Sequence, residues 1–166
     1  MKRIIMIGFF LVLFGCKQIK TMKNGVYPVE SFSVIETTFK DNLAIGYFNM
    51  AYKNYNKKVN YPWYLRISIA LNLENLYENG LPQIEEITIA NRLEDELLSE
   101  MKKITTIHYI GHLFNDTFLD IYIYLDNPEE IHKYLQTQVN KEGLIRGFAY
   151  EIKKDTKWVH VEWILK

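Results

Sequence analysis

The feature that most constrains the fold is the order in which two hydrophobic periodicities alternate along the chain. Between residues 64 and 71 apolar side chains recur at every second position, as in a strand with one buried face. From about Glu85 to Lys102 the apolar spacing becomes helical. Two alternating segments, a second helical segment and a last alternating segment follow. The sequence therefore predicts the order strand, helix, strand, strand, helix, strand.

Turn and capping signals separate these segments. Asn115 to Thr117 stand between the strands predicted for Thr105–Leu113 and Phe118–Leu125, which together make a hairpin. The sequence DNPEE at residues 126–130 supplies a capping side chain, an early proline and two acids, so it opens the second helix. That helix ends before a last long strand at Leu144–Lys153.

Further elements flank this core. Phe32–Phe39 and Leu43–Met50 are predicted to form an N-terminal hairpin. Asp155 is a candidate cap for a short terminal helix, although residues 158–163 also alternate as a strand does. The predicted fold is α+β, a ferredoxin-like βαββαβ antiparallel sheet with two helices on one face. The N-terminal β-hairpin and a short C-terminal element extend it.

The single cysteine of the chain determines where we expect the protein to reside. Lys2 and Arg3 precede an uncharged apolar stretch from Ile4 to Phe14, which has the length of a signal-peptide core. A bilayer span needs about 20 apolar residues, so this stretch is too short for one. Residues 13–16, Leu-Phe-Gly-Cys, resemble the bacterial lipobox, whose cysteine receives a diacylglyceryl group. The alternative is an uncleaved apolar N-terminus with a buried thiol.

Cleavage before Cys16 would divide the chain into three parts. Residues 1–15 are the predicted lipoprotein signal peptide, residues 16–31 the lipidated cysteine and tether, and residues 32–166 one domain. Lys plus Arg balance Asp plus Glu at 20 each, so no strong field gathers nucleic acid. We expect a bacterial cell-envelope protein in membrane contact through its lipid, and no nucleic-acid partner. The membrane leaflet stays open.

Short motifs from residue 32 to residue 165 resemble the bacterial domain-of-unknown-function family 695. They are Pro62 before LRISIAL, GLP at 80–82, LEDEL at 93–97, Gly111, Tyr122 with Tyr124, and Asp155 three residues before Trp158. The family carries no assigned activity or catalytic residues. Its fold resembles that of the type B regulators of ribonuclease E activity, which act by binding a protein. The resemblance implies a binding module, and a cytoplasmic regulator is the alternative where the N-terminal signal is not used.

Residue types that carry chemistry form no recognisable catalytic or metal constellation in the sequence. His108 and His112 are four apart on a predicted strand, roughly 13 Å from each other, which is too far to share a metal. Glu85, Glu86 and residues 94–96 are predicted to lie on the solvated surface of a helix. We find no phosphate-binding glycine loop and no nucleophile elbow. We therefore expect no cofactor and favour binding over catalysis, with an enzyme acting on an envelope substrate as the alternative.

The segment RGFAYEIK at residues 146–153 resembles the start of an RNA-recognition motif, whose aromatic residues stack on bases. That motif belongs on the third strand of its fold, whereas this segment is the fourth strand. Glu151 and Lys153 replace the residues that would continue it. We therefore interpret Phe148 and Tyr150 as ordinary strand aromatics.

Alternation also predicts a candidate binding surface on the sheet face away from the helices. If the aliphatic residues of Phe118–Leu125 pack on the helices, Asp120, Tyr122 and Tyr124 face the other way. Arg66 and Ser68 on the neighbouring strand share this face, and the candidates to join them are His108 and His112. Exposed tyrosine, arginine and histidine are typical of recognition surfaces.

Four of these residues form the predicted partner-binding surface, for a protein or another envelope component: Arg66, His108, Tyr122 and Tyr124. The alternative is that the tether, the N-terminal hairpin or the C-terminal tryptophans cover this face.

Overall fold

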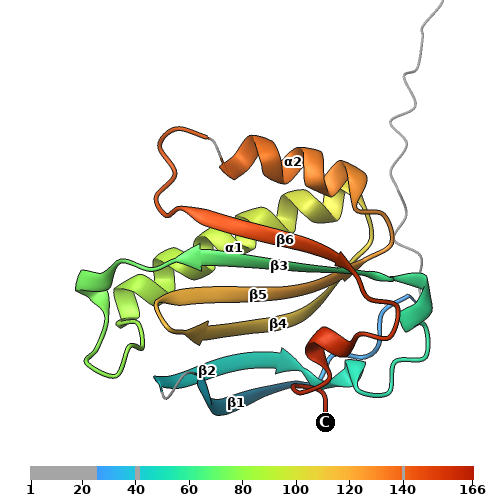
Figure 1. Cartoon of the computed structure of the whole chain (residues 1–166), viewed down its shortest axis with the longest axis horizontal. Helices are drawn as coiled ribbons and strands as arrows, with labels where there is room; N and C mark the ends of the chain where they lie inside the picture. Colours follow the sequence, from blue (N-terminus) through green and yellow to red (C-terminus); the bar gives the residue numbers. More distant parts are fainter. Residues whose placement is uncertain (1–25, 40–41, 140) are drawn as a thin grey trace, which may run out of the picture.

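The computed structural model describes residues 26–39, 42–139 and 141–166. Within them, the two α-helices, α1 and α2, lie on one side of a sheet, and the chain ends on the other side (Figure 1). The strands are β1 (Phe32–Phe39), β2 (Asn42–Asn49), β3 (Trp63–Ala70), β4 (Ile107–Asn115), β5 (Phe118–Leu125) and β6 (Phe148–Lys154), and the helices are α1 (Ile84–Ile104) and α2 (Glu129–Val139).

The strands of the described sheet run in the order β1-β2-β4-β5-β3-β6, and all neighbouring strands are antiparallel. β5 lies between β3 and β4 and is antiparallel to both. The strands β3 and β4 therefore run parallel to each other, with β5 inserted between them. In the same way β3 is inserted between β5 and β6. This is the split βαβ arrangement, used twice. The predicted ferredoxin-like order is confirmed, and the β1–β2 hairpin extends the sheet beyond β4.

The last strand and the C-terminus differ in detail from the prediction. The strand predicted from Leu144 begins at Phe148, because residues 144–147 are irregular and bend at positions 145 and 146. Asp155 accepts hydrogen bonds from the backbone N–H groups of Val159 (3.0 Å) and His160 (3.0 Å). The chain there forms a short 3-10 helix, Val159–Val161. Of the two predicted alternatives, the capped helix is therefore the one observed.

Aliphatic side chains fill the space between the sheet and the helices. The alternating residues of β3 and β5 point toward α1 and α2, as predicted, and are fully buried there. These residues are Leu65, Ile67, Ile69, Leu119, Ile121, Ile123 and Leu125. The apolar stripe of α1 packs on them, because its spacing keeps one side of the helix apolar. Burial of a side chain of this size contributes about 1.5–3 kcal/mol, so this layer dominates the stability of the domain.

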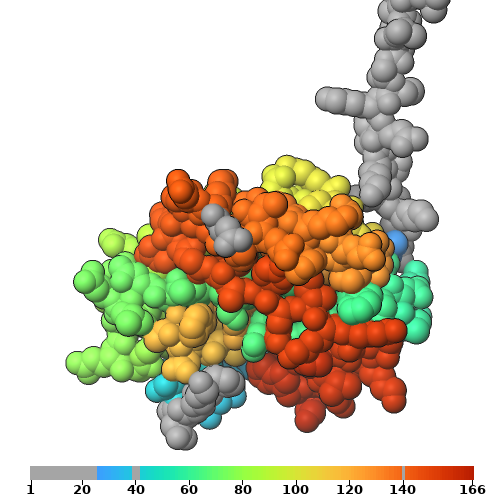
Figure 2. Space-filling model, turned by 45° about the horizontal axis from the view of Figure 1, so that its top comes forward, coloured from blue at the N-terminus to red at the C-terminus, as the bar shows by residue number. Residues whose placement is uncertain are grey.

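The sheet face away from the helices carries a second core, which is rich in aromatic rings. The ring of Tyr124 stacks on Trp158 with 4.0 Å between centroids. The indole Nε1 of Trp158 donates to the carbonyl oxygens of Lys58 (3.2 Å) and Tyr61 (3.0 Å). In Figure 2 the last residues of the chain, in dark red, lie near the teal residues around position 60. The C-terminal segment and the connection from β2 to β3 therefore cover this face together.

Residues that precede the predicted domain boundary at Phe32 contact the domain. The hydroxyl of Tyr55 donates to the carbonyl oxygen of Val26 (2.6 Å), and the backbone N–H of Ser31 donates to Asn49 Oδ1 (3.0 Å). Residues 26–31, assigned above to the tether, thus contact the domain. The predicted signal peptide and Cys16 lie outside the described residues. Among the described helices, none has the length and apolar character needed to cross a membrane.

Candidate binding site on the face opposite the helices

The four residues of the predicted binding surface share one face of the sheet, but three of them are buried. His108 and Tyr124 are fully buried and Tyr122 is nearly so. Only Arg66 among the four has substantial access to solvent, with 39% of its side chain exposed. The prediction of an accessible surface is therefore wrong for His108, Tyr122 and Tyr124. The reason is the aromatic cover just described. Its C-terminal tryptophans belong to the alternative that the sequence left open, whereas the connection from β2 to β3 does not.

His108 is part of the aromatic core. Its Nδ1 lies 3.1 Å from the hydroxyl of Tyr52, and its ring centroid lies 3.9 Å from that of Tyr61 and 5.0 Å from that of Tyr27. Its Nε2 is buried with no partner among the described residues. Burial lowers the pKa of His108 to about 4, because a low-dielectric surrounding disfavours the charged ring. At neutral pH His108 is thus an uncharged packing residue.

Tyr124 joins the sheet to the C-terminal segment through Asp155. Its hydroxyl donates to Asp155 Oδ2 over 2.6 Å, and His160 Nδ1 lies 2.8 Å from the same oxygen. Burial alone would raise the pKa of Asp155, but its hydrogen bonds to His160, Tyr124 and Val159 outweigh burial and hold that pKa well below the usual range. Asp155 is thus a charged residue that fixes the C-terminal segment, from Trp158 onward, to the sheet.

A pocket of about 510 Å³ remains on this face beside Arg66. We call it the Arg66 pocket. Its wall comes from β1, β3, β4, β5 and β6 and from the C-terminal segment, so it crosses almost the whole width of the sheet. It is lined by Thr37, Thr38, Tyr64, Arg66, Leu113, Asn115, Asp120, Tyr122, Glu151, Lys153, His160 and Trp163.

The charges of the Arg66 pocket are paired with one another. Arg66 Nη2 lies 3.1 Å from Glu151 Oε1, and Lys153 Nζ lies 2.6 Å from Glu151 Oε2. Asp120 accepts hydrogen bonds from the hydroxyl of Ser68 and from Asn115 Nδ2, the latter at 3.0 Å. Burial alone would lower the pKa of Arg66, but the carboxylates of Asp120 and Glu151 outweigh it and raise that pKa. The pocket thus has two cations and two carboxylates and little net charge.

Aromatic rings form the other part of this pocket. Trp163 is 43% exposed, and the edge of its ring system meets Tyr122 at 6.5 Å between centroids. The imidazole of His160 stacks on Tyr64 at 4.5 Å. Aromatic surface next to paired polar groups suits a ligand that offers both an apolar side and uncharged hydrogen-bonding groups. Among the described residues no group of three His, Cys, Asp or Glu side chains is placed to hold a metal ion.

Sequence reasoning found Arg66 but missed Glu151 and Lys153, because it does not give the order of the strands. The register pairs Arg66 with Glu151 and Tyr64 with Lys153 across β3 and β6. The alternation of FAYEIKK does place Glu151 and Lys153 on one face, so a signal existed. The sequence assigned Trp163 to the C-terminal element but not to the pocket. Its position depends on a turn whose residues show no clear strand or helix periodicity.

His112 does not share the face of His108, although an even spacing predicts it. A bulge between Tyr109 and Gly111 inserts one extra residue into β4, which turns His112 toward α1. Gly111 adopts φ +148°, and a Cβ there would lie 2.3 Å from the carbonyl oxygen of Tyr47. Glycine is therefore required at this point of the bulge.

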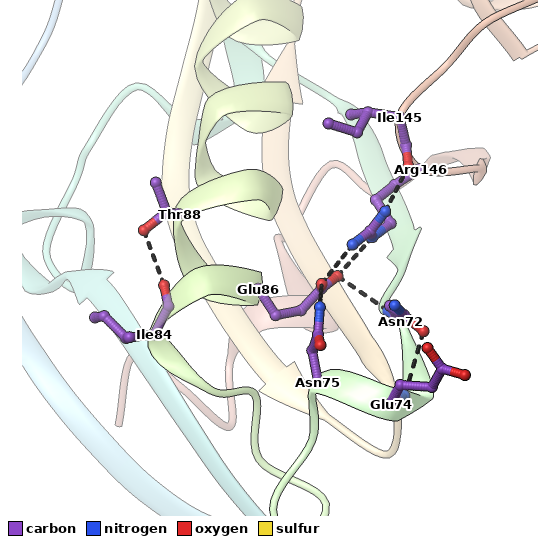
Figure 3. Close-up of polar contacts among 8 residues, drawn as sticks. All are labelled: Asn72, Glu74, Asn75, Ile84, Glu86, Thr88, Ile145 and Arg146. Carbon is purple, nitrogen blue, oxygen red and sulfur yellow. Dashed lines mark hydrogen bonds and ion pairs between the residues drawn. The ribbon is translucent and has the colours of Figure 1, made fainter.

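The acidic residues of α1 are not all on the solvated surface, contrary to the prediction. Glu86 is fully buried and accepts two hydrogen bonds from Arg146, from Nε at 2.7 Å and from Nη2 at 2.6 Å (Figure 3). Asn72 N and Asn75 Nδ2 also donate to its carboxylate, at 3.0 and 3.3 Å. The bonds from Arg146 outweigh burial and lower the pKa of Glu86 to about 2. Arg146, the first residue of RGFAYEIK, is thus engaged within the domain.

Glu94 is the second buried acid of α1. Its Oε2 lies 2.7 Å from His112 Nδ1, and its other oxygen is buried with no partner among the described residues. Glu94 therefore also departs from the predicted solvated surface.

Comparison with known proteins adds a family but no activity. No curated protein and no solved structure matches the chain. One family model does match, described as a family of unknown function, and it spans residues 31–163. That range coincides with the domain that packs around the sheet, so the chain belongs to the family of unknown function DUF695.

Proposed function

We propose that the protein is a bacterial cell-envelope lipoprotein whose domain is a non-catalytic binding module. The lipid is attached at Cys16, and the partner binds in the Arg66 pocket. The observation that carries the binding role is that this pocket combines accessible Arg66 and exposed Trp163 on a face that is otherwise covered. Arginine and tryptophan are the residue types most enriched among energetically dominant contacts.

The chemistry of the pocket indicates the chemistry of the partner. Because Arg66, Lys153, Glu151 and Asp120 balance one another, a ligand of high net charge meets no excess of opposite charge. The ion pair with Glu151 involves one guanidinium nitrogen of Arg66, Nη2. A guanidinium carries five N–H donors, so further donors of Arg66 can bind a partner. We therefore propose a protein segment or another envelope component that presents uncharged polar groups to Arg66 and an apolar side to Trp163.

The proposed anchor lies close to the domain along the chain. Cys16 precedes Val26, the first described residue that contacts the domain, by ten positions, and ten residues span at most about 35 Å when fully extended. A lipid on Cys16 would therefore keep the pocket near the membrane, where an envelope partner is available.

Intact mass and membrane fractionation of the native protein and of Cys16→Ala test the anchor. We expect a membrane-bound form that begins at an acylated Cys16, and we expect the variant to lose both the lipid and the membrane. An unprocessed soluble chain that begins at Met1 would contradict the lipoprotein role and favour a cytoplasmic protein-binding regulator.

Chemical cross-linking in intact cells, followed by purification of the protein, tests the binding role. Arg66→Ala should lower the yield of cross-linked envelope partner at least tenfold, because it removes the donors that the partner needs. The matched control is Lys133→Ala on α2, a cation that pairs with Glu130 on an exposed surface. Equal yields from the two variants would contradict the assignment of the pocket.

A further inference from the structure

A second pocket, of about 380 Å³, lies on the helix side of the sheet at the point where β1 and β2 extend beyond the helices (Figure 1). The sheet forms its floor, and the loop before α1 and the start of α1 form its wall. Its lining is largely apolar and includes Val34, Ile45, Tyr47, Leu81, Ile87 and Phe114. We call it the His112 pocket, after the one ionisable imidazole in its lining.

The imidazole of His112 is held in a fixed orientation. Its Nδ1 lies 2.7 Å from Glu94 Oε2 and 3.2 Å from the hydroxyl of Tyr109. Burial, and then the charge of Glu94 and a hydrogen bond to its carboxylate, raise the pKa of Tyr109, so its hydroxyl stays protonated and donates to Glu94. A carboxylate accepts hydrogen bonds, so the nitrogen of His112 that faces Glu94 carries the proton.

We infer that the opposite edge of the same ring faces the pocket. Nδ1 is turned to α1, His112 lines the pocket, and its side chain is 14% exposed. In the neutral ring with its proton on Nδ1, Nε2 has a lone pair and accepts a hydrogen bond. The pocket thus offers one directed acceptor within apolar walls, which is the pattern of a small-molecule site.

Glu94 lies outside the lining of this pocket and acts on it through His112. It is a buried carboxylate on α1, and its Oε1 has no hydrogen-bond partner among the described residues. A buried carboxylate with an incomplete set of donors is costly. A ligand that donates a hydrogen bond to Nε2 polarises the ring and strengthens the bond from Nδ1–H to Glu94.

The chemistry of the lining favours binding over catalysis. The described residues that line this pocket include no serine, threonine or cysteine, so the Glu94–His112 pair has no such hydroxyl or thiol there to activate. An engineered cavity of about 150 Å³ accepts benzene. A pocket of about 380 Å³ therefore has room for a molecule of two rings.

We propose that the His112 pocket binds a small, largely apolar alcohol or phenol. Its body packs between β2 and the side chains of Leu81 and Ile87, and its hydroxyl donates to Nε2 of His112. This site lies on the opposite side of the sheet from the Arg66 pocket, so it does not depend on the proposed envelope partner.

Calorimetric titration of the full chain with 1-naphthol and with naphthalene tests the proposal, because the two probes differ only in the hydroxyl. We expect 1-naphthol to bind at least tenfold more tightly than naphthalene. His112→Phe should abolish this difference and change the affinity for naphthalene less than about twofold. Arg66→Ala should bind both probes as the native protein does. Equal affinity of the native protein for the two probes would overturn the proposal.

A second measurement on the native protein covers the case in which His112→Phe does not fold. The ¹⁵N resonances of the imidazole report directly on the hydrogen bond. Saturation with 1-naphthol should shift the Nε2 resonance of His112, whereas naphthalene should leave it almost unchanged. Binding of 1-naphthol without a change at Nε2 of His112 would place the ligand elsewhere and would contradict the site.

Discussion

The two faces of the sheet are buried by different means. On the helix face, aliphatic side chains of β3 and β5 pack against the apolar stripe of α1. The fit of these side chains and the apolar area that they bury determine the stability of this layer. On the opposite face, tyrosines and Trp158 meet irregular chain, and each of these side chains brings a polar atom that needs a partner. Aromatic rings of this kind pack well only where their hydroxyl or N–H group is satisfied.

This difference teaches where a binding site can form. A regular helix covers an aliphatic surface continuously, and the aliphatic residues of β3 and β5 beneath the helices are fully buried. A cover of turns and rings follows no regular spacing, and the Arg66 pocket lies beside its end, between Tyr122 and Trp163. We infer that the aromatic face serves stability and binding together, whereas the aliphatic residues of β3 and β5 beneath the helices serve stability.

The largest expected effect separates the two tryptophans of the cover. Trp158→Ala should lower the free energy of unfolding by about 3–5 kcal/mol, because Trp158 is buried, stacked on Tyr124 and hydrogen-bonded through Nε1. Trp163→Ala should cost less than about 1 kcal/mol, since that ring is partly exposed. Urea unfolding followed by circular dichroism measures both. Similar losses would show that the cover does not depend on Trp158.

The next effect concerns the helix face. Arg146→Ala should lower the free energy of unfolding by about 3 kcal/mol, because it leaves Glu86 buried without its bidentate partner. Lys103→Ala removes an exposed ion pair with Glu100 on the same helix and should cost less than about 0.5 kcal/mol. If both variants unfold at the same urea concentration, the buried pair is not a stabilising feature.

Acid should weaken the two faces in different pH ranges. The folded-state pKa of His108 is about 4, below its ordinary value of about 6.5, so the unfolded chain binds the proton first. Stability therefore falls from about pH 6.5 to pH 4, by about 3 kcal/mol. Glu86, with a pKa of about 2, binds its proton less readily when folded, so its contribution is present above about pH 4.5 and lost toward pH 2.

Stability measured from pH 8 to pH 2 for the native protein and for His108→Phe separates these ranges. The variant should lose the decline above pH 4.5 and keep the decline below it, to which Asp155 contributes as well, because its pKa is also lowered. An unchanged decline between pH 6.5 and pH 4.5 in the variant would show that another group controls it.

The smallest expected effect on stability is at the pocket itself. Arg66→Ala should change the free energy of unfolding by less than about 0.5 kcal/mol, because its ion pair with Glu151 is partly exposed to solvent. Thermal unfolding measures this. A loss comparable with that of Trp158→Ala would contradict our view that Arg66 is available for a partner.

The sequence predicted the sheet and the helices but not the cover. The strands and helices follow from patterns with periods of two and 3.6 residues, which depend only on neighbours in the chain. Trp158, by contrast, packs on Lys58, one hundred positions away, and Arg146 reaches Glu86 from sixty positions away. No local pattern encodes such pairs. The bulge at Gly111 likewise moves His112 to the other face through a single inserted residue.

For the candidate site, the sequence placed Arg66 and Tyr122 on the correct face and failed on exposure. Exposure depends on which distant segment returns to the surface, and the return of the last residues is fixed by Asp155 and Trp158. The pairing of Arg66 with Glu151 needed the strand order as well as the alternation. Lipidation of Cys16 stays a prediction.

One measurement tests the central claim most directly, which is that the Arg66 pocket holds an envelope partner. A photoreactive residue replaces Lys153, which lies in the pocket and leaves Arg66 intact, or Lys133 on α2 as the control. After irradiation of cells, we predict a discrete adduct from position 153 that Arg66→Ala abolishes, and no such adduct from position 133. Adducts that are the same at both positions, or unaffected by Arg66→Ala, would contradict the account.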